Sequence, residues 1–213
     1  MMKILLFILL TLNAFSSIGN IMALKGSAEI HRSTNNILTA KSGMQIKEGD
    51  KIVTQSKTRA QIILKDDTII TIGSNSSFSF DTFFFDGSKK STLSMRMNRG
   101  FFRSVTGKIG KIAPERFKVK TSSATIGIRG TDFSVRLQNA IERFRCYSGG
   151  IRITFGNSAR DINAGEVFEL NLDWANNIDI DLPDIKDIEE ASRKIIYPHP
   201  EPIIPDGVPC QLK

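Results

Sequence analysis

Residues 117–137, FKVKTSSATIGIRGTDFSVRL, contain the pattern that decides the fold of this chain. Apolar residues alternate with lysines over residues 117–121, and with polar residues over 132–137. Such period-two alternation is typical of β-strands that bury one face. The sequence therefore predicts two strands. It also predicts that residues 125–132 between them form a short crossing punctuated by two glycines.

The same strand pattern extends over most of the chain. Alternating segments are separated by turn signals at intervals of about 8 to 12 residues, the spacing of all-β sandwiches, rolls and barrels. Residues 59–64 are predicted to form a strand, residues 99–100 to punctuate the chain and residues 148–150 to form a turn. The aromatic set is 14 Phe against one Trp and two Tyr, which also favours strands. The prediction is a mainly β fold, a single β-sandwich or β-roll of short strands over residues 24–172. Residues 173–213 are predicted to form a short C-terminal helix and an extended proline-rich tail.

The N-terminus has the pattern of a secretory signal peptide. Lys3 precedes an almost purely apolar run over residues 4–12, and small and polar residues follow up to Ala23. The apolar run is too short for a comfortable membrane span. We expect a leader over residues 1–23 that is cleaved after Ala23, with Gly19 as the alternative, and an uncleaved anchor as the other reading. The mature protein is then periplasmic or secreted, with no membrane span after cleavage.

Charge is unevenly distributed along the chain, which has a formal net charge of +7. Residues 89–120 contain ten Lys or Arg and one acid, whereas residues 161–190 contain ten acids and one base. A basic surface can bind nucleic acid, but an exported protein rarely meets it. The expected partners are another envelope protein or an anionic envelope polymer, with the chain's own acidic segment neutralising part of the charge.

The sequence contains two cysteines, Cys146 and Cys210, whose thiols an oxidising compartment can join in a disulfide. An even count in an exported chain predicts a disulfide between them, and two unpaired thiols are the alternative. A disulfide closing this loop would contribute about 4 kcal/mol to the free energy of unfolding in the chain-entropy model.

Two blocks of sequence resemble the FecR domain of bacterial envelope proteins. The first is EGDKIVT (48–54) followed by AQIILKDDT (60–68). The second combines RGFFR (99–103), FKVKT (117–121) and ATIGIRGTDF (124–133). The resemblance extends over about residues 25–155. Asp67 stands where the family prefers glycine, so a different turn type is expected there.

The resemblance implies an exported protein that senses, scaffolds or binds a partner rather than catalysing a reaction. Regulators of this family carry a cytoplasmic anti-sigma segment, a membrane span and a receptor-contact subdomain. A cleaved leader at the N-terminus leaves no place for those segments, so the expectation is a soluble periplasmic FecR-domain protein. The alternatives are a polysaccharide- or peptidoglycan-binding protein and a secreted hydrolase.

No arrangement of residues predicts catalysis, a cofactor or a metal. The two histidines lie in unlike contexts, and the basic loop over residues 105–111 lacks the spacing of a P-loop. No G-x-S-x-G elbow supports a nucleophilic serine.

The candidate site is therefore the crossing itself. Its glycines permit close backbone approach or a positive φ, and Arg129 either hydrogen-bonds carbonyls or Asp132, or contacts a ligand or partner. The sequence thus predicts either a structural corner or a partner contact, formed by Gly127, Arg129, Gly130, Thr131 and Asp132.

Overall fold

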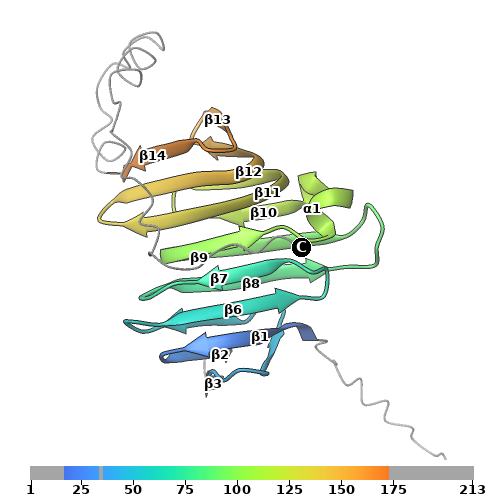
Figure 1. The fold of residues 1–213 in the computed structure, drawn as a ribbon, viewed down its shortest axis with the longest axis vertical. Helices are drawn as coiled ribbons and strands as arrows, with labels where there is room; N and C mark the ends of the chain where they lie inside the picture. Colours follow the sequence, from blue (N-terminus) through green and yellow to red (C-terminus); the bar gives the residue numbers. More distant parts are fainter. Residues whose placement is uncertain (1–16, 34–35, 173–213) are drawn as a thin grey trace, which may run out of the picture. The chain divides into compact units, whose positions relative to one another are not determined.

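The strands follow the alternation of the sequence, with apolar side chains buried at every second position. The structure is a computed structural model that describes residues 17–33 and 36–172. Within these residues, 14 strands form one mixed sheet (Figure 1). In chain order they are β1 (Ser17–Lys25), β2 (Ala28–Ser33), β3 (Asn36–Thr39), β4 (Gln45–Lys47), β5 (Lys51–Thr54), β6 (Arg59–Leu64), β7 (Ile69–Ile72), β8 (Ser77–Phe84), β9 (Thr92–Val105), β10 (Phe117–Lys120), β11 (Ala124–Gln138), β12 (Ile141–Phe155), β13 (Ser158–Asn163) and β14 (Val167–Asn171). The helix α1 (Ile109–Ile112) and the 3₁₀ turn η1 (Pro114–Arg116) lie between β9 and β10.

The sheet is folded over on itself, because the halves of β9, β11 and β12 pair with different neighbours. Layer 1 contains β4, β1, β6, β7, the second halves of β9 and β11, the first half of β12, and β14. Layer 2 contains β3, β2, β5, β8, β10, β13 and the remaining halves of the long strands. All pairings are antiparallel except that of β9 with β10. The predicted mainly β sandwich or roll is confirmed.

One hydrophobic core lies between the layers. The ring of Phe78 in layer 2 lies 5.0 Å from that of Phe102 in layer 1, measured between centroids. Side chains from both layers belong to a single buried cluster, rich in Ile and Phe. Fully burying one such side chain contributes about 1.5–3 kcal/mol. A core of this size can stabilise a domain without disulfides.

Glycines allow the three long strands to bend from one layer into the other. Gly100 in β9, Gly130 in β11 and Gly149 in β12 have φ values of 94°, 59° and 74°. A β-carbon at Gly100 would lie 2.2 Å from Ser76 Oγ, and one at Gly149 would lie 2.4 Å from Gly130 O. The bends at Gly100 and Gly149 thus need both the left-handed backbone and the missing side chain.

Three predicted breaks are wrong, because these glycines bend the strands without ending them. The sequence predicted punctuation at residues 99–100, a crossing over 125–132 and a turn at 148–150. In the structure β9, β11 and β12 each continue through the segment concerned. Glycine permits a positive φ in a bulged strand as well as in a turn, so the pattern alone does not distinguish the two.

The turn between β10 and β11 lies earlier than predicted, at residues 121–124. Thr121 N donates to Ala124 O at 2.9 Å, and Ala124 N donates to Thr121 Oγ1 at 3.0 Å. The fully buried Glu142 of β12 accepts hydrogen bonds from Thr121 Oγ1 at 2.6 Å and Ser122 Oγ at 2.7 Å. Hydroxyl side chains therefore place the turn here rather than at the glycines.

The predicted basic loop contains the short helix α1 and is attached to the core by a buried carboxylate. Asp66, which is fully buried, accepts hydrogen bonds from Thr68 Oγ1 at 2.7 Å and Ile109 N at 3.2 Å. Gly107 N donates to Thr68 Oγ1 at 3.0 Å. Asp67 has a φ of 67°, so it adopts the left-handed conformation that a glycine would take at this turn. Asp66 and Thr68 therefore attach this loop to the turn between β6 and β7, which gives the loop a structural role.

The predicted domain boundaries meet the structure differently at the two ends. The predicted end of the β domain at residue 172 directly follows β14. The predicted C-terminal helix and proline-rich tail lie outside the described residues. At the other end, the predicted cleavage sites after Gly19 and Ala23 both fall inside β1.

Alanine substitution at two of the bends tests the layer crossing. We expect Gly130→Ala to lower the free energy of unfolding by about 1 kcal/mol, the cost of a left-handed alanine, since its β-carbon meets nothing within 4 Å. Gly149→Ala also places a methyl group against backbone atoms and is expected to cost about 3 kcal/mol or more. Urea unfolding of both variants measures the difference. Equal losses would contradict the account of the bend.

Candidate protein-binding site

The predicted site residues lie where β11 passes from layer 2 to layer 1. Thr131 is 3% exposed, accepts a hydrogen bond from Arg129 N at 3.1 Å and donates one to Gly150 O at 2.8 Å. Thr131 N donates to Thr106 Oγ1 at 2.9 Å, and Thr106 N donates to Thr131 O at 3.0 Å. The Thr131 side chain therefore satisfies backbone polar groups that the bulge leaves unpaired and joins β11 to β12, while the Thr131 backbone joins β11 to the loop before α1.

Arg129 and Asp132 are not paired with each other. Asp132 accepts a hydrogen bond from Arg103 Nε at 2.8 Å and a second from the same guanidinium, in a bidentate ion pair between β11 and β9. These hydrogen bonds raise the pKa of the Arg103 guanidinium. The Arg129 side chain is exposed, and within residues 17–33 and 36–172 its guanidinium has no hydrogen bond or ion pair. Arg103, and not Arg129, is the arginine that holds this corner.

Arg103 also belongs to a cluster around Tyr147 on the outward face of layer 1. Its guanidinium carbon lies 4.5 Å from the centroid of the Tyr147 ring, and that of Arg145 lies 5.3 Å from it. The tyrosine hydroxyl is 3.2 Å from Ser134 Oγ. Arg103, Ser134 and Arg145 are cross-strand neighbours on β9, β11 and β12. The sheet register thus places two cations against one aromatic ring.

A second arginine–aromatic contact lies in the adjoining row of the same face. The guanidinium carbon of Arg136 lies 4.9 Å from the centroid of Phe101. Arg136 pairs with Arg143 across β11 and β12, and Arg143 forms an ion pair with Glu169 of β14. We define the arginine–aromatic face as six outward side chains of layer 1, which come from these two rows and from Tyr147 beside them: Phe101, Arg103, Arg136, Arg143, Arg145 and Tyr147.

The arginine–aromatic face has the composition of a protein interface. Four arginines face two carboxylates, Asp132 and Glu169, so the face is positively charged. Tyr147 is 39% exposed, and the four arginines are exposed as well. Arg, Tyr and Phe are enriched at protein interfaces, where they dominate binding energies, whereas Lys is depleted.

The outward face of layer 2 differs in kind. Its exposed cations include Lys118 and Lys120 on β10, whose neighbours across the strands include Ser94 and Thr125. Lysines among hydroxyl side chains are typical of a solvated surface. Layer 2 also carries the exposed arginines Arg96 and Arg152, but these form ion pairs with Asp81 and Asp161, whereas arginines of layer 1 lie against aromatic rings.

Sequence reasoning missed this face although its signal was present. In residues 142–147, ERFRCY, two arginines and the tyrosine alternate with Phe144 and Cys146. Since Phe144 and Cys146 are buried, the alternating residues must share the outer face. The register that aligns them with Arg103 and Arg136 depends on long-range pairing, which no local pattern contains.

Cys146, the first cysteine of the predicted disulfide, lies in the core and forms no disulfide with another described residue. It is fully buried, and its Sγ lies 3.4 Å from Ser148 O. Burial raises the pKa of the thiol, and the charges of Asp132 and Glu166 add to the effect. Cys210 lies outside the described residues, so the disulfide stays a prediction.

Within the described part of the chain, no group of three or more His, Cys, Asp or Glu is placed to hold a metal ion. No helix among those residues is long and apolar enough to cross a membrane.

Residues 50–152 match the family model described as FecR protein. This chain carries a FecR domain. The matched residues extend from the turn before β5 into the second half of β12, and include the arginine–aromatic face. Strands β1 to β4, β13 and β14 lie outside the match but complete the two layers around the FecR domain.

Solved structures that resemble the chain include two crystal structures of a proposed anti-sigma factor from Parabacteroides distasonis ATCC 8503. They have TM-scores of 0.47 and 0.46, are 17% identical, and cover 57% of this chain and 54% of that one. The chain thus spans about half the length of the proposed anti-sigma factor. A cell surface anchoring domain has a TM-score of 0.28 and 27% identity, covering 29% of this chain and 82% of its own. No curated protein gives a significant match.

Substitutions at neighbouring residues separate the structural part of the corner from its free arginine. Thr131→Val leaves buried backbone groups without partners and is expected to lower the free energy of unfolding by about 2 kcal/mol. Arg129→Ala removes an exposed side chain and is expected to change it by less than about 0.5 kcal/mol. Urea unfolding decides between them, and a large loss for Arg129→Ala would show that Arg129 stabilises the corner.

The buried thiol predicts low reactivity for Cys146. In a Cys210→Ser variant, we expect the native protein to react with a thiol reagent at least about tenfold more slowly than the denatured chain, because the thiolate is both shielded and disfavoured. The time course of reagent release measures this rate. Rapid reaction of the native protein would contradict the burial of Cys146.

Proposed function

We propose that this protein is an exported, non-catalytic FecR-domain protein of the bacterial envelope, which acts in sensing or regulation by binding a partner protein. The observation that carries the proposal is the arginine–aromatic face. Export rests on the leader pattern predicted over residues 1–23. The regulatory role rests on the FecR domain at residues 50–152.

The chemistry of the face favours a partner that presents carboxylates beside apolar groups. Guanidinium groups recognise carboxylates in bidentate geometry, as Arg103 already does with Asp132. Tyr147 and Phe101 hold their neighbouring arginines against their rings, so these side chains lose less freedom when a partner binds. An acidic protein surface therefore fits the face.

A polysaccharide fits the same face less well. Binding of sugars by stacking needs an open aromatic surface, but two guanidinium groups lie within 5.3 Å of the Tyr147 ring centroid. A binding experiment must therefore distinguish a protein partner from an anionic polymer.

Charge reversal on the two faces tests the proposal with matched variants. Arg136→Glu with Arg145→Glu, and Lys118→Glu with Lys120→Glu, each replace two exposed cations by anions on opposite faces of the sandwich. After chemical cross-linking in intact envelopes, we expect the arginine variant to lose the cross-linked protein band by at least about tenfold, the scale of a hot spot. The lysine variant should keep it.

Thermal unfolding confirms first that both variants fold. Loss of the band in the lysine variant alone, or in neither, would contradict binding through the arginine–aromatic face. A cross-linked partner that remains after protease has digested this chain would be a polymer in place of a protein.

A further inference from the structure

The strand β1 is part of the core, although sequence patterns assign most of it to the leader. Ile18 is 3% exposed and Ile21 is fully buried. β1 lies in layer 1 between β6 and β4 and pairs with both. We propose that signal peptidase cleaves between Ser16 and Ser17, so that the mature chain begins with the first residue of β1. This inference rests on the proposed export.

Backbone hydrogen bonds tie β1 to segments on both sides. Lys65 N donates to Ile18 O at 2.9 Å, while Ile21 N donates to Met44 O at 2.9 Å and Gly43 N donates to Ile21 O at 2.8 Å. Cleavage after Gly19 would remove the first of these contacts together with Ile18. Cleavage after Ala23 would remove all three, together with both buried isoleucines.

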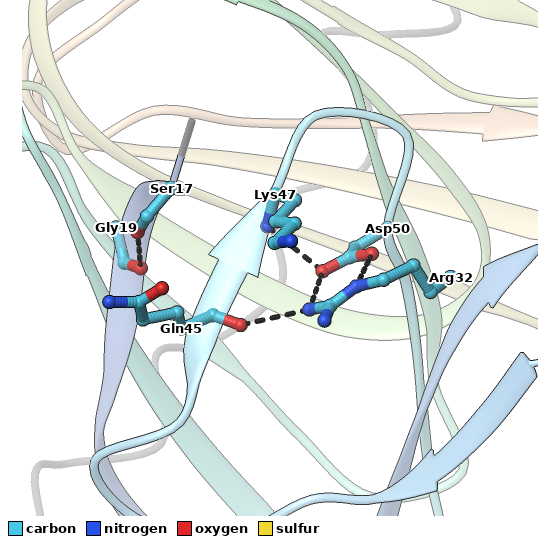
Figure 2. A network of polar contacts seen from close by, with 6 residues as sticks. All are labelled: Ser17, Gly19, Arg32, Gln45, Lys47 and Asp50. Atoms are coloured by element: carbon cyan, nitrogen blue, oxygen red, sulfur yellow. Dashed lines mark hydrogen bonds and ion pairs between the residues drawn. The ribbon is translucent and has the colours of Figure 1, made fainter. Parts of the chain in front are cut away.

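Strand β4, the other neighbour of β1, contributes to a buried ion pair (Figure 2). The carboxylate of Asp50, which is fully buried, accepts hydrogen bonds from Arg32 Nε at 2.9 Å and from Lys47 N at 2.9 Å. Gln45 O of β4 accepts a hydrogen bond from Arg32 at 3.0 Å. β1 is the strand against which β4 is paired, so losing β1 would leave this pair without its support.

Gly19, at the alternative cleavage site, is explained by close packing between strands and not by recognition by signal peptidase. A β-carbon at Gly19 would lie 2.2 Å from Ile63 O and 2.9 Å from Leu64 Cα in the adjoining β6. Only glycine fits such an approach of two backbones. The glycine that resembles a cleavage signal is thus required by the fold.

The sequence also offers a cleavage signal just upstream of β1. Signal peptidase recognises small side chains one and three residues before the cut, and Ala14-Phe15-Ser16 supplies both. For a cut after Ala23, the residue three positions before the cut is Ile21, whose side chain is larger than this rule prefers. Of the three candidate sites, only the one after Ser16 preserves the whole of β1.

The full chain, expressed with its own leader in a bacterial host, tests this site. We expect the intact mass and N-terminal sequence of the exported protein to begin at Ser17. A chain that begins at Asn20 or Leu24 would overturn the site while leaving export intact. A chain that keeps Met1 in the cytoplasmic fraction would overturn export as well.

Two leucine substitutions give a matched control. Ser16→Leu should block processing, because it places a large side chain directly before the cut, whereas Ala23→Leu should be processed like the natural chain. Ala23 is exposed on β1, so the second change leaves the core untouched. Processing blocked by Ala23→Leu and unaffected by Ser16→Leu would overturn the proposal.

Two shortened chains measure the need for β1 without any export step. A chain that starts at Leu24 should unfold at least about 10 °C below one that starts at Ser17, or fail to fold, because it lacks two buried isoleucines and most of a strand that is paired on both sides. Equal melting temperatures would show that the fold does not need β1, which would overturn the argument for the cut after Ser16.

Discussion

The left-handed bends at three glycines are the constraint on which the rest of the structure depends. β9, β11 and β12 each extend through both layers, and each changes layer at a glycine with a positive φ. If these strands ended at the bends, the two layers would be joined only by loops. Because they continue, the sheet is folded as one piece, and the side chains of each long strand contribute to both walls of the core. The residues of the predicted site lie at the bend of β11 and help to connect the two layers.

Buried carboxylates perform the second task, which is to fasten loops to the folded sheet. Asp50, Asp66 and Glu142 are fully buried, and each accepts hydrogen bonds from backbone amides, hydroxyls or a guanidinium. An unpaired carboxylate in the core would be costly, but one with several donors is satisfied in place. Hydrogen bonds to Asp50 also raise the pKa of Arg32. The Gly-Asp and Asp-Asp-Thr motifs that suggested the FecR resemblance are thus turns closed by acidic side chains.

Local patterns predicted the strands well and their continuity poorly. β6 was predicted with the bounds it has, because its alternation is uninterrupted between two turns. The breaks in β9 and β12 were predicted at glycines that bend the chain instead, since the φ of a glycine depends on what packs against it. Arg129 was chosen as the site arginine because it stands in a motif. The arginine that pairs with Asp132 is instead Arg103, which lies 29 residues before Asp132 in the sequence. A pairing of that separation is set by the β9–β11 register, which period-two alternation does not encode.

The same alternation explains why the two outward faces came to differ. On the second halves of β9 and β11 and the first half of β12, the outward residues include arginines and aromatic rings, and the register brings Arg103, Ser134 and Arg145 side by side around Tyr147. In layer 2 the corresponding positions of β10 are lysines. Both faces are basic, so net charge alone would attract an anionic partner equally well to either. Lysine stays strongly hydrated, whereas arginine held on an aromatic ring is partly desolvated already and presents a planar fork. This difference in hydration and geometry is why the proposed function assigns partner binding to layer 1.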